Sequence, residues 1–186
     1  SKLLDRLTGA KLWVRTADGE KAVEPKRGET SYTFTLPAPT ATVGGINEYG
    51  VVQKGENKPF RLIQCPKLVL GADEKPWAKL PIEIVPRRAG DELALTVYFR
   101  GKPAPAGLPV TVHTFDAAEG DPLKTDDKGS VTYKPKGKGL LGFTVPHTVA
   151  EAGEYGGKKY DETRYSASLL VRVGADAPVA KGEPEA

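Results

Sequence analysis

The chain has 186 residues, which is enough for one large domain or two small ones. Its 27 basic and 24 acidic side chains are interleaved and leave a net charge of +3, a balance that argues against a nucleic-acid-binding protein. The 21 glycines and 16 prolines have no period and separate short apolar segments, as in turn-rich β structure. Because no apolar run approaches the roughly 20 residues of a membrane span, no transmembrane segment is expected.

Residues 1–75 predict an N-terminal β unit. Lys11 to Arg15 predicts a strand with Leu12 and Val14 on one face and Trp13 on the other, and it precedes Asp18-Gly19, a strong hairpin signal. The candidate strands that follow are residues 32–36, 42–53 (two pieces, or one strand bulged at its glycines), 60–65 and 68–70. The polar segment 71–79 contains proline and marks a boundary. Trp77 within it is expected to fill the junction between two units.

Residues 76–174 predict a second β unit. Leu93, Leu95 and Val97 fall on one face of a strand, with polar and small residues between them. The other candidate strands are residues 82–85, 110–112, 131–133, 141–145 and 165–173. Short strands at this spacing are typical of an immunoglobulin-like or prealbumin-like sandwich. We therefore expect an all-β protein of two packed sandwich-like units, with a disordered tail at residues 175–186.

Several motifs occur in a defined order along most of the chain. They are Leu80 to Pro86, Gly101-Lys102-Pro103, the Thr125-Asp126 turn and Gly153 to Tyr160 before the last strand. In the order and spacing of these motifs the chain resembles the NikM-like family, bacterial proteins once labelled a nickel uptake substrate-specific region. The resemblance implies an exported β-rich protein, in the periplasm or at the cell surface, associated with metal or haem uptake.

The chain departs from the NikM-like pattern at two places. Family members commonly open with a His-Asp-aromatic segment, so that segment and one or more strands are expected upstream of Ser1. Members often carry a histidine just before the last strand, where this chain has Thr163-Arg164-Tyr165. Both departures concern the metal ligands that the resemblance would otherwise supply.

His113 and His147 are the only histidines, and each lies on or at the end of a candidate strand. If the two strands are neighbours, the imidazoles would meet at one end of the sandwich, with Asp116 and Glu151 near them. Two imidazoles and carboxylates suit Ni²⁺, Cu²⁺ or Zn²⁺, so these four residues form the candidate metal site. The alternative is that they are unrelated polar side chains at strand ends.

Three further features have a functional and a structural interpretation. Tyr155 and Tyr160 flank a polar glycine turn and form a candidate surface for binding a protein or a sugar, or they pack at a sandwich corner. Asp126 to Gly129 fits a hairpin turn better than a calcium loop. Cys65, the only cysteine, lies in a strand-like segment and is interpreted as a buried side chain rather than a reactive thiol.

The sequence lacks the common catalytic and nucleotide-binding motifs, such as G-x-S-x-G, H-E-x-x-H and G-x-x-x-x-G-K-[ST]. We therefore expect an exported, non-catalytic accessory binding protein that serves divalent-metal acquisition. Protein partners or self-association are also expected. The alternative is a structural subunit of a cell-surface layer or filament that assembles through β-strand edges. A spacer module of a larger secreted protein is a third hypothesis.

Overall fold

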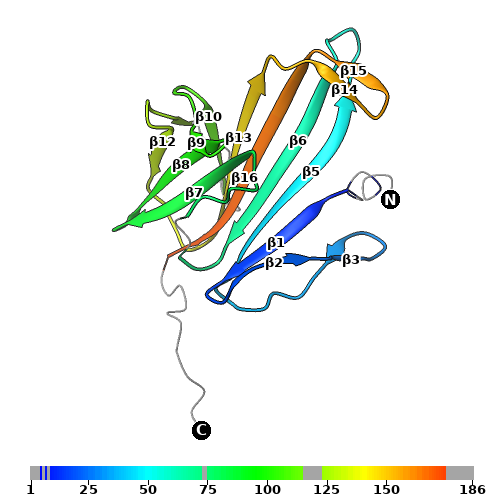
Figure 1. The fold of residues 1–186 in the computed structure, drawn as a ribbon. Helices are drawn as coiled ribbons and strands as arrows, with labels where there is room; N and C mark the ends of the chain where they lie inside the picture. The colour runs from blue at the N-terminus through cyan, green and yellow to red at the C-terminus, as the bar shows by residue number, and fades with distance from the viewer. Residues whose placement is uncertain (1–4, 6, 8, 73–74, 115–122, 175–186) are drawn as a thin grey trace.

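The computed structural model describes residues 5, 7, 9–72, 75–114 and 123–174, and all of its elements are β-strands. An eight-stranded sheet forms the larger layer (Figure 1). Its strands are β1 (Lys11–Thr16), β2 (Gly19–Val23), β5 (Thr42–Val52), β6 (Phe60–Val69), β10 (Pro109–His113), β11 (Leu123–Lys124), β13 (Gly139–Val149) and β16 (Glu162–Val173). They lie in the order β11-β10-β13-β16-β6-β5-β1-β2. The all-β prediction is confirmed.

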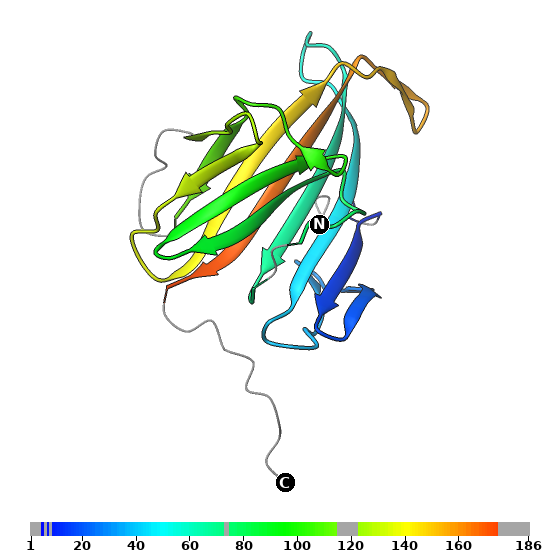
Figure 2. The same ribbon diagram turned by 60° about the vertical axis from the view of Figure 1, so that its left-hand side comes forward.

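A four-stranded sheet packs over part of the large one. It consists of β7 (Ile82–Ala89), β8 (Glu92–Phe99), β9 (Lys102–Pro103) and β12 (Ser130–Tyr133), with β8 paired to the other three. Figure 2 shows its green strands lying over β13 and β16. Two short hairpins, β3 (Lys26–Arg27) with β4 (Tyr32–Thr33) and β14 (Gly153–Tyr155) with β15 (Lys158–Tyr160), complete the fold. The described residues include no helix with the length and apolar character of a membrane span.

Strands of both predicted units enter the large sheet. β6 runs parallel to β16, from Phe60 opposite Glu162 to Val69 opposite Val171. β5 and β13 then pair antiparallel on either side of these two central strands. The predicted boundary at residue 75 lies in the connection between β6 and β7, which carries the chain from the large sheet to the small one. The immunoglobulin-like or prealbumin-like detail stays a prediction, and residues 175–186 lie outside the described residues.

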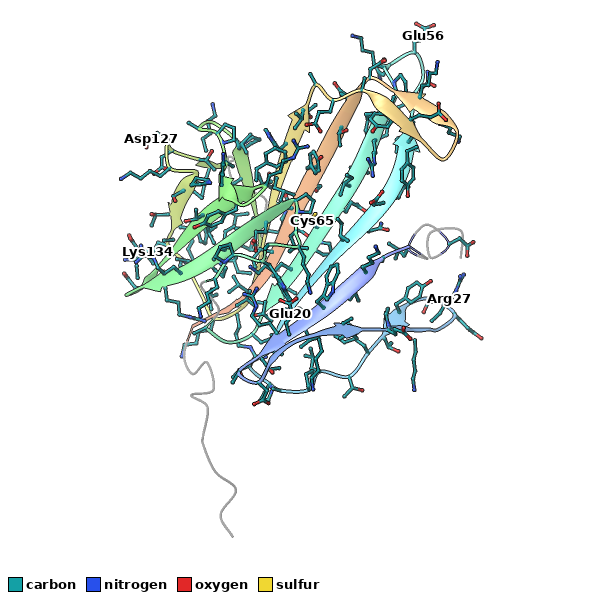
Figure 3. The ribbon with its side chains drawn as sticks, viewed as in Figure 1. Glu20, Arg27, Glu56, Cys65, Asp127 and Lys134 are labelled. Atoms are coloured by element: carbon teal, nitrogen blue, oxygen red, sulfur yellow. The ribbon has the colours of Figure 1, made fainter. Side chains whose placement is uncertain are left out.

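The hydrophobic core fills the space between the two sheets. Leu93, Leu95 and Val97 of β8 are buried there against alternate side chains of β13 and β16, such as Phe143 and Leu169. This alternation is what a strand with one face in a core requires. Cys65 lies in the same core and is 1 % exposed (Figure 3). The predicted burial of Cys65 is confirmed, and because burial disfavours the thiolate, the pKa of Cys65 is raised to about 11.

A buried ion pair joins the two sheets to the segment between them. Lys67 of β6 lies with its Nζ 2.7 Å from Oε2 of Glu83 on β7, and the two side chains are 0 % and 3 % exposed. The other oxygen of Glu83 accepts a hydrogen bond from the backbone N–H of Trp77. The Trp77 ring packs on Gly44, where an added Cβ would lie 2.6 Å from a ring carbon. Trp77 therefore fills the junction, as the sequence predicts.

The turn before β12 is held by its own side chains. Oδ1 of Asp126 accepts hydrogen bonds from the backbone N–H groups of Lys128, at 2.9 Å, and Ser130, at 2.7 Å. Gly129 adopts φ +69°, a left-handed conformation that favours glycine. The carboxylate is thus used within a turn, as predicted, but the turn does not close a hairpin, because β11 before it pairs with β10 and β12 after it pairs with β8.

Candidate functional site

The structure separates the two histidines of the predicted metal site. His113 on β10 lies opposite Gly142, and His147 lies five positions further along β13, opposite Tyr165. Five residues of strand correspond to about 17 Å, and an odd separation places the two side chains on opposite faces of the sheet. The predicted meeting of His113 and His147 is therefore wrong.

The other two predicted ligands do not restore that site. Asp116 lies outside the described residues. Glu151 lies at the same end of the sandwich as His147, but its Oε2 accepts a hydrogen bond from Nη2 of Arg100 at 2.6 Å. Within the described ranges, no three His, Cys, Asp or Glu side chains are grouped closely enough to hold a metal ion. The register of β10 and β13 separates the two histidines, because it fixes which side chains share a face of the sheet.

His147 instead belongs to an aromatic cluster at the end of the core. Its ring meets Phe99 edge-on, with centroids 4.6 Å apart, and Phe99 meets Tyr165 in the same way at 5.1 Å. The Arg100 guanidinium also donates to the Tyr165 hydroxyl at 3.1 Å. Burial, followed by the charge of Arg100, lowers the pKa of His147. The cluster thus combines a neutral imidazole with a cation, which opposes the entry of a second cation.

Ionisation of His147 links this cluster to stability. Since its pKa is lower in the folded chain, the unfolded chain binds the proton more readily. The contribution of His147 is therefore fully present above the ordinary histidine pKa of about 6.5 and is lost as the pH falls below it. Arg100 also lowers the pKa of Glu151, chiefly because its guanidinium donates a hydrogen bond to the Glu151 carboxylate.

His113 lies on the outer face of the large sheet, which we define as the face turned away from the four-stranded sheet. Its Nε2 lies 2.9 Å from Oγ1 of Thr144 on β13, so a hydrogen bond joins the two neighbouring strands. Both side chains are half-buried. They form one end of a depression that we call the outer-face hollow.

The outer-face hollow crosses the middle of the large sheet and has a volume of about 480 Å³. Its lining includes Leu12, Phe34, Val43, Pro66, Leu68, His113, Gly142, Thr144, Ser168 and Leu170. Pairing fixes these positions: Leu68 lies opposite Leu170, which lies opposite Gly142, which lies opposite His113. Gly142 and Ser168 are small, so the surface sinks between the larger apolar side chains.

The far end of the outer-face hollow is closed by the segment that follows β4. Phe34 and Leu36 of this segment pack on Val14, Ala41 and Val43 in a second, smaller apolar cluster. Phe34 thereby becomes a wall of the hollow at the end opposite His113. Apolar side chains at one end and polar ones at the other give the hollow a direction.

A family model described as a domain of unknown function (DUF4198) matches residues 4–149, well over half of the chain. The chain belongs to the DUF4198 family. Searches of curated proteins and of solved structures gave no match. The matched part of this DUF4198 protein ends at the last residue of β13. It therefore includes the His113 and Thr144 end of the outer-face hollow, whereas Ser168 and Leu170 on β16 follow it.

The two tyrosines of the DUF4198 protein that we considered for recognition differ in exposure. Tyr155 in β14 is 37 % exposed, and the guanidinium of Arg61 lies 4.8 Å from the centre of its ring. Tyr160 in β15 is buried, and an added Cβ at Gly153 would lie 2.6 Å from its hydroxyl oxygen. Tyr160 thus packs at a corner of the fold, while Tyr155 is available at the surface. Recognition by Tyr155 stays a prediction.

Sequence reasoning found His113 but missed the hollow of this DUF4198 protein. Its floor comes from Pro66, Ser168 and Leu170, which the sequence showed only as members of strands. One signal was present: the alternation in β16 puts Ser166, Ser168 and Leu170 opposite the buried Ala167 and Leu169. The apolar Leu170 beside the small Ser168 on this solvent face indicates a shallow, partly apolar depression in the sheet.

Proposed function

We propose that the protein is an exported, non-catalytic accessory binding protein of the periplasm or cell surface that holds its ligand in the outer-face hollow. One observation carries the proposal: a depression of about 480 Å³ with mainly apolar walls and a few polar groups at one end. Small-molecule sites in proteins have volumes of about 300–1,000 Å³ and this composition. The resemblance to exported β-rich proteins supports the compartment.

The scaffold of the outer-face hollow suits binding without rearrangement. Its floor consists of paired strands in the centre of the large sheet, where β13, β16 and β6 are each bonded on both sides. The opposite face of these strands is packed in the core. A site built on such rigid elements is preformed, so little ordering entropy is lost when a ligand enters.

The proposal predicts that the protein binds an uncharged apolar probe in the hollow. N-phenyl-1-naphthylamine, which fluoresces in apolar surroundings, should bind saturably to the wild-type protein. Ser168→Leu fills the floor and should weaken this binding by at least about tenfold. Ser166→Leu is the matched control, because Ser166 lies on the same face of β16 but outside the lining. Equal binding by both variants, or no saturable binding by the wild type, would contradict the proposal.

Divalent-metal acquisition, with Ni²⁺, Cu²⁺ or Zn²⁺ as cargo, is a second candidate function. The narrower NikM-like resemblance supports it, although the charge of Arg100 opposes a cation beside His147. Since His113 and His147 lie on opposite faces, each imidazole would act separately. Calorimetric titration of the metal-stripped protein beside His113→Ala and His147→Ala single variants tests this; binding that neither variant changes would contradict it.

Assembly into a surface layer or filament is the remaining candidate. β2 supports it, because this exposed strand ends the large sheet and, among the described strands, pairs with β1 alone. Such an edge can accept a strand from another chain. Glu20 on this strand, which pairs with Arg15 and Lys79, would have to be accommodated in the contact. Sedimentation over a range of concentrations tests assembly, which a concentration-independent monomer would contradict.

A further inference from the structure

The chemical class of the ligand can be argued from the outer-face hollow, and this inference rests on the proposed function. Among the residues that the structure describes, Lys67 is the one lining residue with a charged side chain. Its ammonium group is 0 % exposed and lies on the other face of the sheet, 2.7 Å from Glu83. A charged group that gave up water against these apolar walls would gain no opposite charge from the described lining, which is costly. The lining favours an uncharged occupant.

The polar groups of the hollow are gathered at one end. His113 and Thr144 are hydrogen-bonded to each other at 2.9 Å, on the neighbouring strands β10 and β13. A hydroxyl and an imidazole can both donate and accept, so together they can bind a hydroxyl or a carbonyl group. The opposite end, at Leu12 and Phe34, is apolar. The occupant should accordingly have a polar head at one end and an apolar body.

The dimensions of the hollow limit that body to one chain. Its lining runs from β10 to β1, which are five strand spacings or about 24 Å apart in the sheet. A volume of about 480 Å³ spread over this length describes a narrow, elongated depression, which suits one extended chain better than a broad ring system. Ser168 leaves room for such a chain to cross β16, whereas the His113 side chain lies over Gly142, its Cβ 3.2 Å from an added Cβ there.

We propose that the outer-face hollow binds a single-chain, uncharged amphiphile. Its hydroxyl or carbonyl head lies at His113 and Thr144, and its hydrocarbon chain crosses β13, β16, β6 and β5 toward Phe34. Apolar contact with Leu170, Leu68 and Pro66 supplies the affinity, and the polar end sets the orientation. Charged amphiphiles of the same length bind more weakly because the described lining offers no counter-charge.

Three ligands with one chain and different heads test the proposal. 1-Dodecanol, dodecanoate and dodecylamine are titrated at pH 8 into the wild-type protein loaded with N-phenyl-1-naphthylamine. Dodecanol should displace the probe at a concentration at least about tenfold lower than either charged analogue. Thr144→Val should weaken dodecanol several-fold, whereas Thr148→Val, on the same face of β13 but outside the lining, should not.

The outcomes separate this inference from the function on which it rests. Dodecanoate or dodecylamine displacing the probe as well as dodecanol would overturn the inference, as would the failure of all three chains to displace a bound probe. Equal effects of Thr144→Val and Thr148→Val would overturn the proposed orientation. If the probe itself does not bind to the wild-type protein, the proposed function fails and the inference fails with it.

Discussion

Replacing Lys67 by methionine is expected to lower the free energy of unfolding by about 3–5 kcal/mol. The substitution leaves the carboxylate of Glu83 buried without its 2.7 Å partner, between two sheets that exclude water. The backbone N–H of Trp77 is then the remaining described donor to Glu83. Urea denaturation followed by tryptophan fluorescence measures the loss, since Trp77 lies at the same junction.

A double-mutant cycle distinguishes the loss of the ion pair from the loss of packing. Glu83→Gln removes the charge but keeps an oxygen that can accept the Trp77 N–H. The Lys67→Met/Glu83→Gln variant should therefore recover much of the stability that either single variant loses. A double variant whose loss equals the sum of the two single losses would show that Lys67 and Glu83 act independently.

Gly129→Ala is expected to cost about 3 kcal/mol, from two causes that act together. An alanine at φ +69° has an unfavourable left-handed backbone. Its Cβ would also lie 2.8 Å from the backbone nitrogen of Ala104 and 3.0 Å from the carbonyl oxygen of Val97, and backbone atoms cannot rotate aside. Thermal unfolding measures the loss.

Gly90→Ala is the matched control for the turn at Gly129. Gly90 adopts a similar φ of +64°, but nothing lies within 4 Å of an added Cβ. This variant should lose only the conformational part, about 1 kcal/mol. Similar losses in the two variants would mean that the turn before β12 does not press on the backbone of Val97 in β8 and of Ala104 after β9.

The sequence predicts the local structure of this protein well, because strand alternation and turn chemistry are local properties. The faces of β8 and β13 follow directly from the alternation of Leu93, Leu95 and Val97 and of Leu141, Phe143 and Val145. Residues 42–52 form one strand, with an irregularity between Glu48 and Gly50. The sequence left this open between two pieces and one bulged strand, and the structure confirms the second.

Strand partners are long-range, and the sequence did not reveal them. The parallel pairing of β6 with β16 joins segments about a hundred residues apart, and no local pattern indicates it. Pro66 was expected to break a strand, yet β6 continues through it, because β16 still pairs at Pro66 while the ladder to β5 is interrupted there. The sequence also did not reveal the register of β10 against β13, and for that reason the prediction that His113 and His147 meet was wrong.

We propose that the ligand binds in the outer-face hollow, and a map of amide chemical-shift changes tests this most directly. Isotope-labelled protein is titrated with 1-dodecanol, and the shifted residues are assigned. The account predicts saturable shifts at Gly142, Ser168 and Leu170, with little change at Arg100 and Tyr155 at the end of the sandwich. Shifts confined to that end, or no saturable shifts at all, would contradict it.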